Sequence, residues 1–341
     1  MHVFVTGGAG FIGSHVVEYH LARGDRVHVV DDLSTGSLEN LRPHLDHPNF
    51  QFDEADILTW SELTRVAAWA DRVVHLAAVV GMLRVLAEPI RVLAINIAAT
   101  ERLFRAIESG GWRPQVLVAS SSEVYGPRAE GALDEEADLT LPSGAVVRWN
   151  YAVSKLADEA LALSYHRKRG IPVTVVRFFN TIGPRQRGRY GMVAPRFVAQ
   201  AVAGEPMTVF GDGLQRRSFC DVRDTVALLD DLASNPASAG QIVNVGNDRE
   251  ISILDLAQAV KEQAGSDSPI VHVPYEEAYG DEFEEVPCRR PRLDRLRQLT
   301  SHRHRYSLED TLADLVARAC QPSLDRPAVA ARQVEAETVA I

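Results

Sequence analysis

The stretch Thr6-Gly7-Gly8-Ala9-Gly10-Phe11-Ile12-Gly13 decides the fold of this 341-residue chain. The apolar run Val3 to Val5 before it is too short for a helix and is typical of a buried parallel strand. Ser14 to Arg23 after it is predicted to be a helix, which Gly24 stops. Strand and helix patterns continue to alternate up to about Phe178, which predicts an α/β fold with a doubly wound, Rossmann-type parallel sheet.

The glycines and the acid that follows them predict a dinucleotide site. Gly7 permits a tight turn, Gly10 lets the backbone approach a pyrophosphate, and Gly13 allows helix and strand to pack closely. A second strand ends at Asp31-Asp32, where a carboxylate accepts hydrogen bonds from an adenosine ribose and repels a 2′-phosphate. The pattern favours NAD over NADP, and a glycine-rich turn without a ligand is the alternative.

Tyr151 and Lys155 form a second motif, in the segment Tyr151-Ala152-Val153-Ser154-Lys155. On a helix these two side chains share a face, so both can reach one cofactor. The chain has 36 Lys and Arg residues but only three lysines, so a lysine here indicates a site where a compact ammonium matters. The alternative is a solvated lysine beside a core tyrosine.

With these two motifs the sequence resembles the extended short-chain dehydrogenase/reductase family, in particular its nucleotide-sugar epimerases, dehydratases and decarboxylases. The resemblance runs from the glycine loop to about Leu315. Further matching pieces are Asp56-Ile57, His75-Leu76-Ala77-Ala78, Asn96, Ser120 to Gly126, Arg177-Phe178-Phe179-Asn180, Gly204-Glu205-Pro206, Phe210-Gly211-Asp212-Gly213, Arg217-Ser218-Phe219 and Arg289-Arg290-Pro291.

The resemblance implies a domain organisation along the chain. It implies an NAD-binding domain at 1–180, a mainly nucleotide-sugar-binding α/β part at 181–320, and a tail at 321–341 that we expect to be disordered. The implied NAD contacts are Gly7, Gly10, Phe11, Ile12, Gly13, Asp31, Asp32, Ser34, Asp56, Ile57, Leu76, Ala77, Ala78, Asn96, Ser120, Tyr151, Lys155 and Phe178. The implied substrate contacts are Ser121, Ser122, Glu123, Tyr151, Asn180, Arg185, Arg217 and Arg289.

The resemblance assigns the chemistry to Tyr151, Lys155, Ser121, Ser122 and Glu123. Tyr151 as a phenolate is expected to take the proton of a sugar hydroxyl while hydride passes to NAD. The Lys155 ammonium and the cationic nicotinamide are expected to lower the pKa of Tyr151, which is ordinarily near 10. Ser121 matches a hydroxyl that hydrogen-bonds the same sugar oxygen, and its alternative is a strand-end hydroxyl that satisfies a loop amide.

Arginines are the expected phosphate ligands, because a guanidinium can donate two parallel hydrogen bonds to phosphate. Arg217 and Arg289 match positions that contact phosphate in the family, and Arg185 is a further candidate. For each of these arginines, a solvated loop side chain is the alternative.

The segment Ser121-Ser122-Glu123 limits which of the family's reactions this chain is expected to catalyse. Dehydratases of the family have Thr-Asp-Glu here, so Ser122 in place of the acid disfavours dehydration. Glu123 and Arg289 leave a uronate decarboxylase open, whereas residues 188–193 resemble bacterial 4-epimerases. The sequence-based expectation is therefore a 4-epimerase of UDP-glucuronate or UDP-glucose, with a UDP-glucuronate decarboxylase second. A protein that binds NAD without turnover is the remaining alternative.

Composition excludes other classes of partner. The net charge of −10 argues against a nucleic-acid or anionic-membrane surface, and no apolar run approaches the length of a membrane span. Three scattered cysteines predict a reduced, cytoplasmic protein with no metal site. Two very apolar helices, over 90–109 and around Tyr151, match those that pair in family dimers, and we expect a homodimer.

Overall fold

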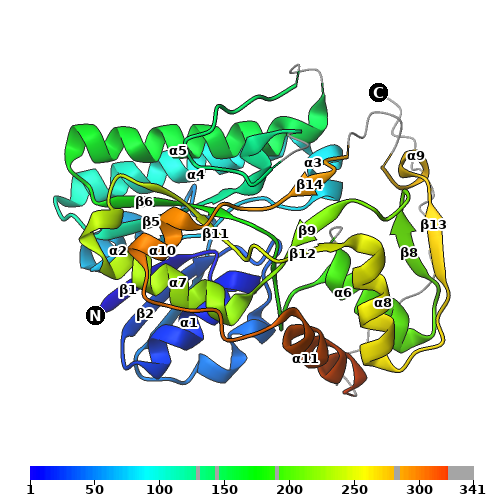
Figure 1. The fold of residues 1–341 in the computed structure, drawn as a ribbon. Coiled ribbons are helices and arrows are strands. Elements are labelled where there is room, and N and C mark those ends of the chain that lie inside the picture. The colour runs from blue at the N-terminus through cyan, green and yellow to red at the C-terminus, as the bar shows by residue number, and fades with distance from the viewer. Residues whose placement is uncertain (128–130, 143–145, 189–191, 280–284, 322–341) are drawn as a thin grey trace, which may run out of the picture.

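The central layer of the computed structural model is a seven-stranded parallel sheet in the order β11-β6-β5-β4-β1-β2-β3 (Figure 1). The structure describes residues 1–127, 131–142, 146–188, 192–279 and 285–321, so the tail predicted to be disordered lies outside it from residue 322 onward. The strands of this sheet are β1 (His2–Thr6), β2 (Arg26–Asp31), β3 (Phe50–Glu54), β4 (Arg72–His75), β5 (Gln115–Ser121), β6 (Val173–Phe178) and β11 (Ile242–Val245). The Rossmann-type prediction is confirmed.

Valine-rich strands build the sheet because both of its faces are covered. Val5 of β1 pairs with Val29 of β2 on one side and with Val74 of β4 on the other, and all three side chains are buried. Helix α1 (Phe11–Ala22) begins three residues before the predicted Ser14, because Gly10 occupies the N-cap and the glycine loop turns directly into the helix. This early start brings the first N–H groups of α1 to the end of β1.

Helices form a layer on each face of the sheet (Figure 1). One face is covered by α1, α7 (Val222–Ser234) and α10 (Asp294–Leu299), which share a core with valines of the sheet. The other face is covered by α2 (Leu63–Trp69), α4 (Pro89–Gly110) and α5 (Asn150–Arg169), whose buried side chains include Phe104 and Ile107. The predicted long helices at 90–109 and around Tyr151 are therefore present as α4 and α5.

Helices α4 and α5 lie side by side in the outer layer (Figure 1). Ile90 on α4 is 83% exposed and Val153 on α5 is 44% exposed. These exposed apolar side chains fit a helix-mediated homodimer, which stays a prediction.

The chain returns to the main sheet after residue 180, and here the structure differs from the expected division into domains. Strand β11 pairs with β6, with Val243 opposite Val176, and both are buried. Without β11, the valines of β6 would lie at an open sheet edge, which is why the chain's later part contributes a strand, α7 and α10 to this layer. The NAD-binding layer is thus not contiguous in sequence.

The smaller part is a separate α/β layer with its own apolar core, which includes Phe197, Leu256 and Leu312. Its strands are β7 (Thr181–Ile182), β8 (Met207–Phe210), β9 (Arg216–Ser218), β10 (Cys220–Asp221), β12 (Glu250–Ser252), β13 (Ile270–Val273) and β14 (Cys288–Arg289). Its helices are α6 (Val193–Ala203), α8 (Ile253–Ala264), α9 (Tyr275–Tyr279) and α11 (Leu308–Cys320). The remaining elements are the short α3 (Met82–Ala87) and the 3-10 turns η1 (Leu38–Asn40), η2 (Arg42–His44), η3 (Ser122–Tyr125), η4 (Val147–Trp149) and η6 (Pro236–Ser238).

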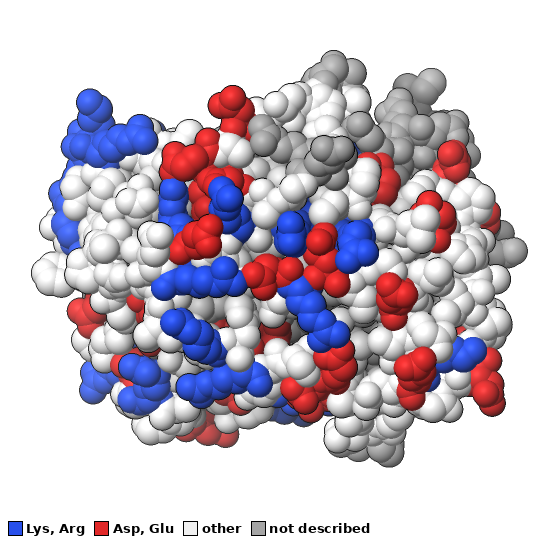
Figure 2. All heavy atoms as spheres, in the orientation of Figure 1, with Lys and Arg blue, Asp and Glu red and all other residues white. Residues whose placement is uncertain are grey.

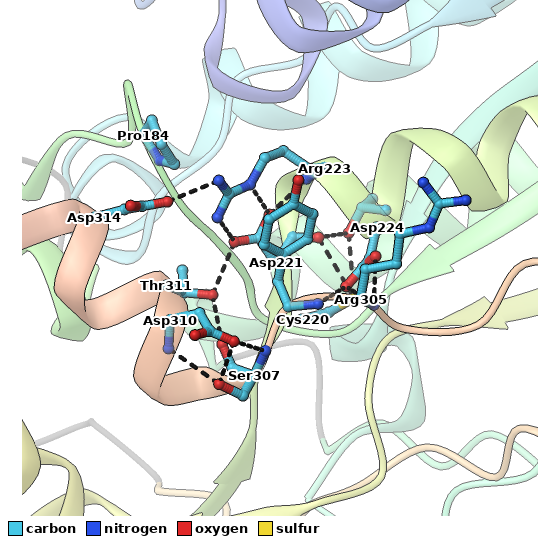
Figure 3. A network of polar contacts seen from close by, with 12 residues as sticks. Pro184, Cys220, Asp221, Arg223, Asp224, Arg305, Ser307, Asp310, Thr311 and Asp314 are labelled. Atoms are coloured by element: carbon cyan, nitrogen blue, oxygen red, sulfur yellow. Dashed lines mark hydrogen bonds and ion pairs between the residues drawn. The ribbon is translucent and has the colours of Figure 1, made fainter.

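A polar network at the start of α7 joins the two parts (Figure 3). The Asp221 carboxylate caps α7 by accepting from the Arg223 backbone N–H at 2.7 Å, and it also accepts from the Thr311 hydroxyl of α11 at 2.8 Å. The Arg223 guanidinium reaches Asp314 of α11 at 2.7 Å. Because Asp221 is buried and fully partnered, this network fixes α11 on α7 and so orients the smaller part over the sheet.

The face shown in Figure 2 carries basic and acidic side chains interspersed rather than a broad patch of one sign. Within the described residues, no helix is both long and apolar enough to cross a membrane.

Candidate active site

One continuous cavity of about 560 Å³ opens at the C-terminal ends of the parallel strands. In open α/β sheets this edge is where ligands bind. Along the sheet the cavity passes β2, β1, β4, β5 and β6, and then reaches the three-stranded sheet β12-β9-β14. Its glycine-loop end is lined by residues 7, 10–13, 31, 32, 34, 35 and 55–57. Its arginine end is lined by Glu123, Arg148, Arg217, Glu285 and Arg289.

Close backbone packing shapes the glycine-loop end. A Cβ atom on Gly13 would lie 2.2 Å from the carbonyl oxygen of Gly7, and one on Gly7 would lie 2.8 Å from the backbone nitrogen of Ala77. Gly7 also has a φ of +73°, which favours glycine. The loop therefore admits no side chain at these positions and presents the N-terminus of α1 to the cavity, as a pyrophosphate requires.

Asp31 closes the glycine-loop end at the tip of β2. Its two carboxylate oxygens accept from the backbone N–H groups of Ala9 at 3.0 Å and Leu33 at 2.8 Å. Burial raises the pKa of Asp31, although both hydrogen bonds oppose that rise. Each oxygen retains a second lone pair, so the carboxylate can still accept from a ribose hydroxyl. Asp32 lies beside it and accepts from the Ser34 N–H at 2.9 Å.

All but one of the other predicted NAD contacts line the cavity: Phe11, Ile12, Asp56, Ile57, Leu76, Ala77, Ala78, Ser120, Tyr151, Lys155 and Phe178. Asn96 is the exception. It is buried behind the wall, where its Oδ1 accepts from the Val79 N–H at 2.7 Å and its Nδ2 donates to the Ser154 hydroxyl at 3.1 Å. Both polar atoms of Asn96 thus hold residues of the cavity wall, and its contact with NAD stays a prediction.

Tyr151, Lys155 and Ser121 meet where β5 ends and α5 begins. The Ser121 hydroxyl accepts from the Glu123 N–H at 3.2 Å, which is the loop-amide role considered for it, and it lowers the pKa of the nearby Tyr151 phenol. Its expected hydrogen bond to the sugar oxygen stays a prediction. Burial raises the pKa of Tyr151 more than the charge of Lys155 lowers it. Lys155 lowers the pKa of Tyr151 as expected, and the share of that effect expected from the nicotinamide stays a prediction.

An ion pair between Glu123 and Arg289 dominates the arginine end. Burial would raise the pKa of Glu123, but the positive charges of Arg289 and of Arg148, whose Nη2 lies 3.8 Å away, outweigh it and lower the pKa. Glu123 is therefore a carboxylate in this site. Arg289 is buried, and its Nε and Nη2 groups have no hydrogen-bond partner among the described residues. Those N–H groups are suited to an anionic ligand. Ser122 also lines the cavity.

Arg217 pairs with Arg289 across β9 and β14, so their side chains lie on one face of that small sheet. Its Nη2 donates to Glu285 at 2.5 Å. Burial and the nearby charge of Arg289 lower the pKa of Arg217. Asn180, which has a φ of +32°, lines the cavity and donates to the Ser218 carbonyl at 2.9 Å.

Arg185 lies apart from Arg217 and Arg289. Its Nη1 donates to the Ser14 hydroxyl of α1 at 3.3 Å, and its Nη2 pairs with Glu18 at 2.5 Å. The preceding residue, Pro184, accepts a hydrogen bond at 2.9 Å from His15, whose pKa is lowered to about 4 by burial. Arg185 thus lines the cavity beside the helix of the glycine loop, and not among the arginines expected to hold the substrate.

Several residues at the arginine end of the cavity were not among the predicted site residues. Arg148, which stacks on the Trp149 ring, precedes the tyrosine motif by only three residues and could have been noticed there. Glu285, Tyr275 and Gln215 belong to no motif, and only the folded chain brings them to the cavity.

Known proteins resemble this chain over most of its length. Residues 3–246 match the NAD dependent epimerase/dehydratase family. UDP-N-acetyl-alpha-D-glucosaminuronate decarboxylase of Bacillus cytotoxicus is 35% identical over 317 residues, which cover 92% of this chain and 95% of that protein. UDP-glucuronic acid decarboxylase 4 of Arabidopsis thaliana is 34% identical and covers 93% of this chain and 68% of its own length.

Solved structures share the fold. UDP-glucuronic acid 4-epimerase from Bacillus cereus, in complex with UDP-glucuronic acid and NAD, aligns with a TM-score of 0.82 at 27% identity and covers 94% of this chain and 99% of that one. The chain belongs to the NAD dependent epimerase/dehydratase family, and its cofactor is NAD.

Proposed function

We propose that this member of the NAD dependent epimerase/dehydratase family decarboxylates a UDP-linked hexuronate after oxidation at C4. The observation that carries the proposal is the partly buried Glu123–Arg289 pair near Tyr151, in which two nitrogen atoms of the buried Arg289 have no partner among the described residues. A carboxylate at C5 of the sugar can accept from those groups, whereas a hydroxymethyl group brings no charge to a buried guanidinium. The decarboxylases at 34–35% identity support placing a decarboxylase ahead of a 4-epimerase. This ranking reverses the sequence-based expectation.

The glycine loop and Asp31 would hold NAD, which supplies an acceptor for hydride from the carbon that bears the reacting hydroxyl. Tyr151 is the base for that hydroxyl's proton. Because burial keeps its phenol neutral, Tyr151 depends on positive charge close to its oxygen, of which Lys155 supplies one part. Ser121, whose hydroxyl lowers the pKa of the nearby Tyr151 phenol, would hydrogen-bond the reacting sugar hydroxyl and keep it aligned with Tyr151.

Oxidation at C4 makes the C5 carboxylate a β-keto acid. When the bond between C5 and the carboxyl carbon breaks, its electron pair moves into the C4 carbonyl, carbon dioxide leaves and an enolate remains. A proton delivered to C5 then restores the C4 ketone, which is the 4-keto product. Return of the hydride to C4, with the Tyr151 proton going to the C4 oxygen, would give the xylo-configured pentose. Glu123 offsets part of the positive charge of Arg289. Arg289 can therefore orient the sugar carboxylate without stabilising its negative charge so strongly that the loss of carbon dioxide is slowed. Arg217, held by Glu285, is left for the diphosphate.

A 4-epimerase is the second candidate, supported by the alignment with the UDP-glucuronic acid 4-epimerase over 94% of this chain. In that case Tyr151 would return its proton after hydride reached the other face of the C4 ketone. The carboxylate would remain on the sugar, and Arg289 would serve only to bind it.

An NMR time course separates the two reactions. Purified enzyme receives UDP-glucuronate labelled with carbon-13 at the carboxyl carbon, then the 2-acetamido analogue, with no added NAD. Labelled bicarbonate together with UDP-xylose or its 4-keto precursor supports the decarboxylase. A galacto-configured uronate that keeps its label supports the epimerase and contradicts our proposal. The better of the two substrates identifies the group at C2.

A further inference from the structure

A buried carboxylate that the mechanism above does not use lies one helical turn beyond Lys155. The Nζ atom of Lys155 donates to Oδ2 of Asp158 at 3.1 Å. Both residues are nearly fully buried, with side-chain exposures of 4% and 1%. The other carboxylate oxygen of Asp158, Oδ1, is buried with no hydrogen-bond partner in the described part of the chain. A buried carboxylate held through one oxygen is costly to stability, so packing alone does not account for it.

Helix α5 places the Lys155 ammonium between the Tyr151 phenol and the Asp158 carboxylate. Tyr151 precedes Lys155 by four residues and Asp158 follows it by three, so all three side chains occupy one face of α5. Any negative charge on Asp158 offsets the positive field of Lys155 at the Tyr151 oxygen. Consistent with this placement, the negative charge of Asp158 raises the pKa of both Tyr151 and Lys155.

The neighbouring carboxylates on other elements have partners of their own. Glu159 accepts two hydrogen bonds at 2.8 Å from Arg177 of β6 and one at 2.5 Å from Ser120 of β5. Glu123 of η3 is paired with Arg289. Each of these carboxylates therefore acts on the helix face through a pair whose charges largely cancel.

The remaining titratable neighbour is His75, at the end of β4. Burial and the charge of Lys155 lower the pKa of His75 to about 3, so its ring is neutral in the working range. Thr6 and Thr100 hold that ring at 2.7 and 3.1 Å. Asp158 is thus the neighbour whose charge faces Lys155 without an arginine to offset it.

We propose that Asp158 is a positioning residue that holds the Lys155 ammonium and sets the pH at which Tyr151 gives up its proton. The proposal rests on the assigned role of Tyr151 as the base. It makes the Lys155–Asp158 pair, and not Lys155 alone, the unit that controls Tyr151.

The test titrates the Tyr151 phenol in the NAD-loaded enzyme by its ultraviolet phenolate band. The difference between each protein and its counterpart with Tyr151→Phe isolates this one tyrosine. Asp158→Asn removes the charge at constant shape, and we expect its Tyr151 to ionise at lower pH than in the unmodified protein. Asp158→Glu, which restores the carboxylate, should return the midpoint toward the original value. The acidic limb of the turnover profile should move in the same direction.

Two controls keep the result decisive. Glu101→Gln removes a carboxylate from the neighbouring helix α4, where it pairs with Arg105 at the surface, and should leave the midpoint unchanged. If Asp158→Asn does not fold, Asp158→Ser, which keeps an oxygen that can accept from Lys155, carries the same expectation. An unshifted midpoint in a folded Asn or Ser variant, or an equal shift in Asp158→Glu, would overturn the proposal. Because the titration needs no substrate, it stands apart from the choice between decarboxylase and epimerase.

Discussion

The two ends of the cavity are built in opposite ways. The glycine-loop end is formed by backbone groups at positions that admit no side chain. Most of its lining residues come from two nearby stretches of the chain, within 7–13 and 31–35. The arginine end uses charged side chains from separate segments, with Glu123, Arg148 and Arg289 brought together by the fold. The glycine-loop end thus depends on local backbone geometry, whereas the arginine end depends on paired charges that only the folded chain brings together.

Tyr151 lies between the two ends, and its removal should have the largest effect on turnover. We expect Tyr151→Phe to lower kcat by about 10²- to 10⁴-fold, because the base for the hydroxyl proton is lost. NAD should still co-purify, which the absorbance of the released cofactor measures. Tyr165→Phe, on the same helix but stacked on Phe104, should keep full turnover. Unchanged turnover in the Tyr151→Phe variant would contradict the assignment of Tyr151 as the base.

Gly13→Ala should damage the glycine-loop end alone. The added Cβ would meet the Gly7 carbonyl oxygen at 2.2 Å, so the loop must open and its pyrophosphate cradle is lost. The purified variant should carry little NAD, while calorimetry should still detect UDP at the arginine end. Gly265→Asn is the matched control, because its left-handed position has open space and asparagine tolerates it. Loss of UDP binding along with NAD would show that the two ends are not independent.

Arg289→Lys should damage the arginine end of the cavity alone. A lysine keeps the charge but loses the fork that serves Glu123 and the ligand together, so kcat/KM should fall by about 10- to 100-fold. NAD content should not change. Arg290→Lys, at the adjacent and more exposed position, should have little effect. A variant with Arg289→Lys that turns over normally would leave the Glu123–Arg289 pair without its assigned role.

Arg185→Gln is expected to have the smallest effect, and it decides to which end this residue belongs. Its contacts with Ser14 and Glu18 predict NAD retention weakened by about two- to fivefold, the range of a partly exposed ion pair. The substrate KM should stay the same. If KM rises while NAD retention holds, Arg185 is a substrate ligand, as the sequence had suggested. Arg216→Gln, an exposed arginine of β9, serves as the control.

Sequence and structure agree best where the chemistry is local. The glycine loop, Asp31 and the Tyr151–Lys155 spacing depend on neighbours within one or two elements, so their patterns predicted the parallel sheet and the NAD site. They could not predict the partners of the buried Asn96 amide, because its contacts with Val79 and Ser154 depend on how α4 packs against the chain after β4 and against α5.

What the sequence by itself determined is the Rossmann-type sheet, the family and the cofactor, because short-range periodicity and glycine geometry encode them. Only the tertiary structure decided that β11 completes the sheet, that Arg185 lies beside α1, and that Glu123 and Arg289, 166 residues apart, form one partly buried ion pair. Such contacts depend on the summed packing of the whole chain, and electrostatic pairing in a buried site responds to distances that no local pattern contains.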